Sequence, residues 1–227
     1  MTPRLIRVDL HIHSCYSEDG NGTPKEIVKS VRKKGLNGIA ITDHNTVKGS
    51  LKALRFRSDD FVVIPGEEVS TLNGHLLVYG IKDDLPKGKS IEETVEIAID
   101  EGGVPVVPHV YRLFSGIKRR NLLKIRKHVG AMEVFNSCSW KRVNKKMSKL
   151  AKRFGFGGTG GSDAHCPEHA GYGYTLINTT DLSLDSILTE IEKGRTWGVG
   201  QCLPLKVKKD RAVLAVKQFF QRGFKKI

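Results

Sequence analysis

The stretch "RVDLHIHSCYSEDG", residues 7–20, begins as an apolar alternating run and ends in two histidines and a carboxylate. His11 and His13 are separated by a single residue, so on an extended chain both side chains point to the same face. Such a pair fits two arms of one metal site, and it equally fits a solvated surface. Only the rest of the chain separates the two interpretations, because short motifs often match by accident.

Similar short apolar runs recur along the 227 residues: "LIRVDL", "GIAIT", "FVVIP", "HLLVYG", "VPVVP", "AMEVF", "FGGTG" and "GYTLI". Several intervals between them have helical spacing. Thr23 is a predicted helix N-cap, with Pro24 at the first helical position and Glu26 closing a capping box. Ser90 and Glu93 repeat that pattern. Nearly continuous apolar strands that alternate with helices predict a parallel sheet covered on both faces.

The number of these units predicts the α/β class and a distorted (β/α) TIM-like barrel within one domain, residues 1–200. The stretch "KDRAVLAVKQFFQRGFKKI" is typical of a basic amphipathic helix. Residues 201–227 are therefore predicted to be a basic C-terminal extension, packed on the barrel or appended to it.

The formal net charge of +14 is concentrated in two segments. Residues 118–153 carry thirteen Lys and Arg against one acid, Glu133, and residues 206–227 carry eight against Asp210. This concentration fits attraction to a polyanion such as nucleic acid. It also fits two solvated lysine-rich helices, as on many thermophile surfaces.

Four cysteines without CxxC spacing predict reduced thiols and a cytoplasmic protein. No apolar run approaches the roughly 18 residues that a membrane span needs, so no transmembrane segment is expected. The oligomeric state is left open.

Metal-competent side chains follow almost every apolar run. In a (β/α) barrel the carboxyl ends of the strands converge on the face that carries the active site. Histidines and carboxylates suit divalent ions such as Zn²⁺, Mn²⁺ or Fe²⁺, and there are more of them than one ion needs, so two or three ions are expected. The residues concerned are His11, His13, Asp43, His44, Glu67, Glu68, His109, Asn136, Cys138, Asp163 and His165.

As an ordered set these residues resemble the PHP (polymerase and histidinol phosphatase) family, from about residue 6 to about residue 198. The resemblance implies a distorted (β/α)7 barrel with a trinuclear metal centre that hydrolyses phosphoesters by a metal-activated hydroxide. The motifs that carry it are His11-x-His13, Asp19, Thr42-Asp43-His44, Gly66-Glu67-Glu68, Pro108-His109 and Gly161-Ser162-Asp163-Ala164-His165.

By position, the resemblance implies three ligand sets. The first metal takes His11, His13, Glu68 and Asp163. The second shares Glu68 and adds His109, and the third takes Asp19, His44 and His165. Cys138 lies where some relatives have a histidine for the second metal. It is either a thiolate ligand there or a small buried hydrophobe.

The same resemblance suggests catalytic roles for Glu68, Asp163 and His165. His75 is a candidate general acid or a satisfied core histidine, and Arg195 is a candidate phosphate-binding residue or a surface arginine. Two neighbours are given supporting roles: Glu67 points away from Glu68, and Asp43 orients a ligating histidine.

The predicted enzyme is thus a metal-dependent hydrolase of a phosphomonoester or phosphodiester. A nucleotide or short oligonucleotide is favoured because of the basic segment 118–153. One alternative is a phosphatase of a small metabolite such as histidinol phosphate. Another is a non-catalytic nucleic-acid-binding barrel like that of a ribonuclease P protein, although such a scaffold would have little reason to keep the whole ligand set.

Overall fold

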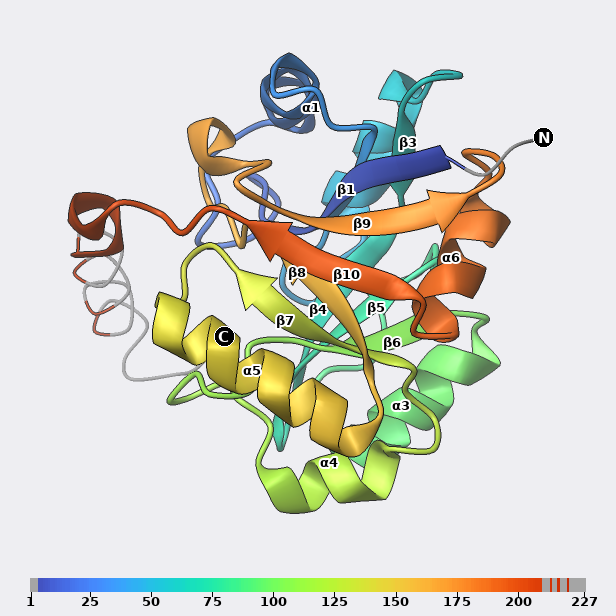
Figure 1. The fold of residues 1–227 in the computed structure, drawn as a ribbon, viewed down its shortest axis with the longest axis vertical. Helices are drawn as coiled ribbons and strands as arrows, with labels where there is room; N and C mark the ends of the chain where they lie inside the picture. Colours follow the sequence, from blue (N-terminus) through green and yellow to red (C-terminus); the bar gives the residue numbers. More distant parts are fainter. Residues whose placement is uncertain (1–3, 210–212, 214–215, 217–219, 221–227) are drawn as a thin grey trace.

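The computed structural model describes residues 4–209 and the single residues 213, 216 and 220. Strands and helices alternate along most of it, except that β3, β4 and β5 follow one another directly (Figure 1). The strands are β1 (Arg4–Ile12), β2 (Gly38–Ile41), β3 (Val62–Ile64), β4 (Gly66–Thr71), β5 (Gly74–Tyr79), β6 (Val104–Val107), β7 (Ala131–Asn136), β8 (Gly157–Gly161), β9 (Gly173–Thr179) and β10 (Thr196–Gly200). The helices are α1 (Pro24–Lys33), α2 (Lys48–Ala53), η1 (Leu54–Phe56), α3 (Ile91–Asp100), α4 (Arg119–Ile125), α5 (Lys141–Phe154), η2 (Pro167–His169) and α6 (Leu184–Glu192).

Each of the eight predicted apolar runs lies in a strand, whereas β4 and β10 were not predicted. β4 contains two adjacent glutamates and β10 contains two glycines, so neither shows the expected apolar pattern. The predicted capping box of α1 is confirmed. The Thr23 hydroxyl accepts from the Glu26 N–H, and the Glu26 carboxylate accepts from the Thr23 N–H.

The strands form two five-stranded sheets, in the orders β10-β9-β1-β2-β3 and β4-β5-β6-β7-β8. Only part of each sheet is parallel, namely β1-β2-β3 and β6-β7-β8. β9 runs antiparallel to β1 and β10, and β5 runs antiparallel to β4 and β6. The fold is therefore mixed α/β.

The predicted α/β class is confirmed, but the predicted parallel sheet is only partly parallel. The described strands form no closed barrel, so the distorted (β/α)7 barrel is not confirmed. β4 and β5 are joined by a tight turn at residues 72–73, which leaves no room for the crossover helix that a parallel pair needs. The chain passes from the first sheet into the second at Pro65, which has no N–H to donate to a strand ladder.

Two isolated bridges join the sheets near the carboxyl ends of β1, β2 and β8. Ile12 at the end of β1 pairs with Ala164 beyond β8, and His44 beyond β2 pairs with Glu68 of β4. The Asp163 N–H donates to the His11 carbonyl at 2.7 Å, and the Glu68 N–H donates to the Asp43 carbonyl at 3.1 Å. We call this junction the seam. It brings together the strand ends that carry the predicted ligands.

The core has three parts. One lies between the first sheet and α1, a second lies between the second sheet and helices α3 to α5, and a third takes side chains from both sheets and from α6. In the third part Tyr79 of β5 is fully buried, and its hydroxyl donates to the Leu10 carbonyl of β1 at 2.8 Å. The two sheets are thus packed against one another below the seam.

The segment after β10 is irregular in structure but packs against the rest of the protein. Leu203 is buried, and its N–H donates to the Ser137 carbonyl at 2.8 Å. Residues 205–209 are helical. The rest of the predicted C-terminal helix, except residues 213, 216 and 220, lies outside the described residues. None of the described helices is both long and apolar enough to cross a membrane.

Candidate metal centre

The end of β1 places His11 and His13 side by side. Both side chains are buried, and strand alternation directs them to one face with Ile12 opposite. Their Nε2 atoms are 3.2 Å apart, and each lies 3.3 Å from Oε2 of Glu68. Two imidazole nitrogens and a carboxylate oxygen therefore converge on one point. This arrangement satisfies few hydrogen bonds and fits a cation.

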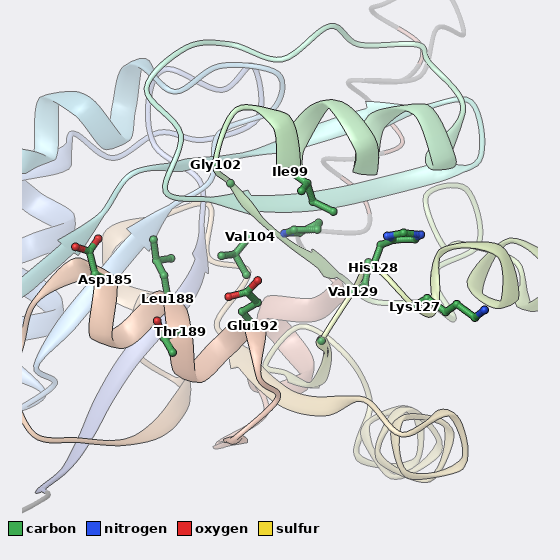
Figure 2. Close-up of a pocket in the computed structure, with 13 residues that line it drawn as sticks. Ile99, Gly102, Val104, Lys127, His128, Val129, Asp185, Leu188, Thr189 and Glu192 are labelled. Atoms are coloured by element: carbon green, nitrogen blue, oxygen red, sulfur yellow. The ribbon is translucent and has the colours of Figure 1, made fainter.

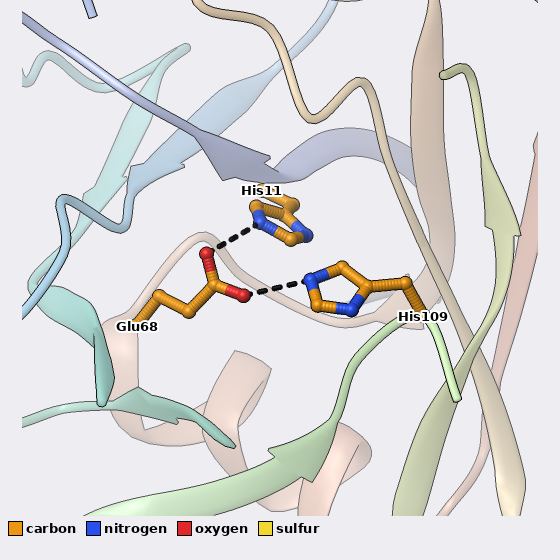
Figure 3. A group of neighbouring side chains, drawn as sticks. All are labelled: His11, Glu68 and His109. Atoms are coloured by element: carbon orange, nitrogen blue, oxygen red, sulfur yellow. Dashed lines mark hydrogen bonds and ion pairs between the residues drawn. The ribbon is translucent and has the colours of Figure 1, made fainter. Parts of the chain in front are cut away.

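Glu68 of β4 is the residue around which the histidines gather. Its side chain is fully buried, and Figure 3 shows its two oxygens turned to His11 and His109. The distance to His109 Nε2 is 2.8 Å. Within 3.5 Å of one oxygen or the other lie imidazole nitrogens of His11, His13, His44, His75 and His109.

This crowding sets the ionisation of the centre. Burial alone would raise the pKa of Glu68, but the positive charge of His11 and the other histidines outweighs it and holds that pKa well below its usual range. Burial conversely disfavours charged His13, yet hydrogen bonds to Asp163 and Glu68 raise the pKa of His13 to about 9. The carboxylates that attract these protons attract a divalent cation in the same way.

Asp163 follows β8 and closes the centre from the other side of the seam. Its Oδ1 is 3.6 Å from His13 Nε2, while its Oδ2 accepts from Asn136 Nδ2 at 3.1 Å and contacts the Arg112 guanidinium. The backbone φ of Asp163 is +52°, in the left-handed region that costs a non-glycine residue about 1–3 kcal/mol. In this strained conformation the Asp163 side chain is directed toward the histidines.

A second group lies beside the first. The carboxylate of Asp19 is 2.8 Å from His165 Nε2 and 3.5 Å from His44 Nε2. The rings of His13 and His165 are 4.3 Å apart between centroids, so the two groups are contiguous. Burial opposes ionisation of Asp19, but the charge of His165 outweighs it and holds the pKa of Asp19 well below its usual range.

Four sets of three side chains place their donor atoms within 4.8 Å of one another. They are His11-Glu68-His109, His11-His13-Asp163, His13-His44-Glu68 and His13-Asp19-His165. Imidazole nitrogens and carboxylate oxygens are the donors that Zn²⁺, Mn²⁺ and Fe²⁺ accept. The Nδ1 atom of His44 lies 3.5 Å from Glu68 Oε2 and has no hydrogen-bond partner among the described residues, which also favours a role as a metal ligand over ordinary core packing. The residues present fit divalent metal ions.

The sequence patterns do not reveal two residues of the centre, Glu133 and Arg112. Glu133, on β7, accepts from His11 Nδ1 at 2.9 Å and from the His109 N–H at 3.0 Å. In the sequence, Glu133 could have been noticed as an acidic residue inside an otherwise apolar strand. Arg112 contacts Asp163 with 34% of its side chain exposed. In the sequence, Arg112 could have been noticed because it lies three residues after the candidate ligand His109, in the same loop.

Arg195 and Cys138 are not brought into these sets. Arg195 lies just before β10, at the end of the sheet opposite the centre, and its exposed guanidinium pairs with Glu190 at 2.8 Å. The structure therefore does not bring Arg195 to the centre, because β10 runs parallel to β1 and begins at the far end of the sheet. The Cys138 Sγ lies 3.3 Å and 3.2 Å from the carbonyls of Ser162 and Asp163.

The structure also places three neighbouring residues that the sequence analysis singled out, namely His75, Glu67 and Asp43. His75 does reach the centre, with Nδ1 3.0 Å from Glu68. Glu67 points away from Glu68, as predicted, and accepts from the Leu85 N–H at 2.7 Å. Burial raises the pKa of Glu67 to about 8. The interpretation of Asp43 as the partner of a ligating histidine is wrong, because both of its oxygens accept from Ser14.

A separate cleft of about 600 Å³ opens at the amino ends of β6 and β7 (Figure 2). Lys127 and His128 lie on one side of it, and Asp185 and Glu192 of α6 lie on the other. None of the side chains that converge on Glu68 lines this cleft. The metal-competent centre and this cleft are at opposite ends of the strands.

Two family models match the chain, the PHP domain over residues 9–102 and the PHP-associated region over residues 141–196. A probable phosphatase from Caldicellulosiruptor saccharolyticus is 27% identical over 197 residues, which are 71% of this chain and 81% of that protein. The matched segments contain most of the side chains that gather around Glu68 and Asp19.

Solved structures share the fold. A two-domain Bacteroides vulgatus protein, described as containing a predicted PHP-like metal-dependent phosphoesterase, superposes with a TM-score of 0.76 at 17% identity, over 88% of this chain and 66% of that one. The lesion-specific endonuclease of Pyrococcus furiosus superposes with a TM-score of 0.65 at 18% identity, over 86% of this chain and 58% of that one.

Proposed function

Because this chain belongs to the PHP family of metal-dependent phosphoesterases, we propose that its substrate is a nucleotide or a short oligonucleotide, hydrolysed at a phosphomonoester or phosphodiester bond. The basic segment 118–153 supports a polyanionic substrate. The endonuclease among the structural neighbours acts on nucleic acid, which supports the same class.

The observation that carries this proposal is the position of Glu68. One buried carboxylate contacts five imidazoles that come from four loops and strands, on both sides of the seam. A structural ion pair needs one partner. A buried carboxylate among this many nitrogen donors would hold divalent metal ions together with those histidines.

We assign the ligands as the family resemblance implied. His11, His13, Glu68 and Asp163 would hold one ion, Glu68 and His109 a second, and Asp19, His44 and His165 a third. When bound, divalent ions such as Mn²⁺, Zn²⁺ or Fe²⁺ supply an activated water and neutralise charge on the phosphate. Glu133 orients His11, so that its Nε2 faces the centre.

Two further side chains act on the substrate in this proposal. Arg112 provides the guanidinium that binds phosphate oxygens, because it is the arginine that reaches the buried centre and remains partly exposed. His75 is 13% exposed and turns Nδ1 to Glu68. Its other nitrogen can therefore carry the proton that the leaving alcohol takes.

The test is Mn²⁺-dependent product formation from a 5′-phosphorylated oligonucleotide and from histidinol phosphate. We expect the oligonucleotide to be shortened stepwise, the reaction to disappear in Asp163→Ala, and Asp185→Ala to behave as the unmodified protein. Asp185 is a suitable control because it is an exposed aspartate at the far cleft. Phosphate release from histidinol phosphate alone would contradict the proposed substrate class, and no turnover of either would contradict the proposed function.

A further inference from the structure

Helix α5 is a one-sided concentration of positive charge. It carries seven Lys and Arg, all exposed, and residues 134–162 contain no Asp or Glu. None of the seven forms an ion pair with another described residue, whereas Lys124 of α4 pairs with Glu92 of α3. A lysine-rich surface stabilised by its own ion pairs would place acids among these cations. The charge of α5 is therefore available to a partner.

A groove of about 510 Å³ runs between α5 and β10, within the range of ligand pockets. Lys141, Asn144, Lys145 and Ser148 line one wall. Their spacing of i, i+3, i+4 and i+7 places them on a single stripe of the helix. The half-buried Phe135 lies in the same groove. The groove therefore offers two cations, two polar groups and an aromatic ring.

The groove is close to the metal centre. Asn144, on its wall, donates from Nδ2 to the Asn136 carbonyl at 3.1 Å and accepts from the Asn136 N–H at 3.2 Å. Asn136 in turn donates from Nδ2 to Asp163 Oδ2 at 3.1 Å. A single pair of hydrogen-bonded residues thus lies between the groove and the carboxylate of the centre.

Trp140 lies beside the groove, immediately before Lys141. Its side chain is 49% exposed, and the Lys208 ammonium lies 5.0 Å from the ring centroid. Trp140 is also the N-cap of α5 and makes no side-chain capping bond, and the first turn holds no acid. An exposed indole beside uncapped N–H groups and lysines combines the two features that bind single strands, an aromatic surface for bases and positive charge for phosphates.

We propose that the groove between α5 and β10 binds the single-stranded nucleic acid that leads to the metal centre, with phosphates on Lys141 and Lys145 and one base stacked on Trp140. The two lysines are about 6 Å apart along the helix axis, close to the separation of successive phosphates in an extended strand. This inference rests on the proposed function, since it assigns the subsite for that substrate.

The test is fluorescence anisotropy of a labelled single-stranded oligonucleotide whose phosphorothioate linkages resist hydrolysis, titrated with the Mn²⁺-loaded protein at several salt concentrations. We expect Trp140→Ala to raise the Kd by about tenfold and Trp140→Phe to recover most of the affinity. We expect the double variant Lys141→Glu with Lys145→Glu to lower the salt slope of log K by about 1.4, because each phosphate that a lysine neutralises contributes about 0.7.

The chain offers matched controls. Trp197 is 56% exposed on β10 and does not line the groove, so Trp197→Ala should bind as the unmodified protein. Lys25 and Lys29 have the same i, i+4 spacing on α1 and are exposed, so their double Glu variant should keep the salt slope.

The inference is overturned if Trp140→Ala binds no more weakly than Trp197→Ala, or if the two double variants behave alike. Weaker binding of the Lys141, Lys145 variant to phosphatidylserine vesicles, with unchanged oligonucleotide affinity, would overturn it in favour of a membrane surface. Mn²⁺-dependent shortening of an unmodified 5′-phosphorylated oligonucleotide by the unmodified protein is measured alongside. Its absence would contradict the proposed function without affecting the binding result.

Discussion

Nδ1 of His11 lies 2.9 Å from Oε1 of Glu133, and this contact decides which imidazole nitrogen faces Glu68. A carboxylate behind a ligating histidine fixes the ring and makes the other nitrogen a stronger donor. The His11 Nε2 atom is accordingly the one that lies 3.3 Å from Glu68.

Replacing Glu133 should therefore weaken the metal centre without removing a ligand. We expect Glu133→Gln to lower Mn²⁺ affinity by about 10- to 100-fold, because the amide supplies no negative charge behind His11. Isothermal titration with Mn²⁺ measures the change. Glu192→Gln, a glutamate at the far cleft, is the control and should bind normally. Equal affinity in the two variants would show that Glu133 does not act on the ligands.

Metal binding should raise the thermal stability of the protein. A ligand at one hundred times its Kd stabilises the folded state by about 2.7 kcal/mol. For a domain of this size that is roughly 5–10 °C in Tm. Thermal unfolding followed by circular dichroism, with Mn²⁺ and then with excess EDTA, measures it. The shift should become smaller in Asp163→Ala, which removes a ligand of one of the three proposed ions, and an unmodified protein with the same Tm in both buffers would argue against the metal centre.

Substitutions of Arg112 and of Arg195 should have clearly different effects on enzyme activity. We expect Arg112→Ala to reduce kcat/KM by about 100-fold or more, because a donor to the developing phosphate charge is removed. Arg195→Ala should stay within about twofold of the unmodified enzyme, because its guanidinium pairs with Glu190 far from the centre. Steady-state kinetics on a 5′-phosphorylated oligonucleotide tests both. The reverse order would restore the role that family position suggested for Arg195.

Cys138 should not be a metal ligand. Its Sγ is directed to the carbonyls of Ser162 and Asp163, and no metal-competent set of the described residues includes it. We expect Cys138→Ala to retain the metal content of the unmodified protein, measured by inductively coupled plasma mass spectrometry. His109→Ala serves as the positive control for removal of a ligand. One ion fewer per chain in Cys138→Ala would establish the thiolate.

Gly161 should tolerate no side chain. A Cβ on this residue would lie 2.3 Å from the His11 Cβ and 2.9 Å from the His11 nitrogen, where β8 approaches β1. We expect Gly161→Ala to destabilise the protein by about 1–3 kcal/mol, since the two strands must separate. Urea denaturation measures the change. An unchanged midpoint would mean that the seam is less tightly packed than the structure indicates.

Most candidate ligands of the centre could be predicted from sequence because they follow an apolar run, whereas Asp19 was placed only by the family resemblance. Alternation explains His11 and His13, and strand ends explain His44, His109 and Asp163. Glu68 was found through its position after an apolar run, although the strand that holds it was not. Convergence of strand ends is therefore a strong guide even where strand directions are wrong.

Residues that contact a candidate metal ligand, without being ligands themselves, showed no such pattern in the sequence. Glu133 contacts His11 across 122 positions of sequence, and Arg112 reaches Asp163 across 51. Those contacts depend on which strands become neighbours. The position of Arg195 could not be predicted for the same reason. The glycine-rich sequence of β10 did not identify it as a strand, so nothing indicated that Arg195, just before β10, lies at the end of the sheet away from the centre.

The bridge between His44 and Glu68 makes two metal-competent side chains part of the backbone pairing that holds the sheets together. Ions bound there would cross-link the two sheets, in addition to the packing, hydrogen bonds and ion pairs that already join them. The free energy of metal binding and the free energy that holds the two sheets together are then thermodynamically coupled. A substitution that loosens either sheet would weaken metal binding, even when it lies far from every ligand.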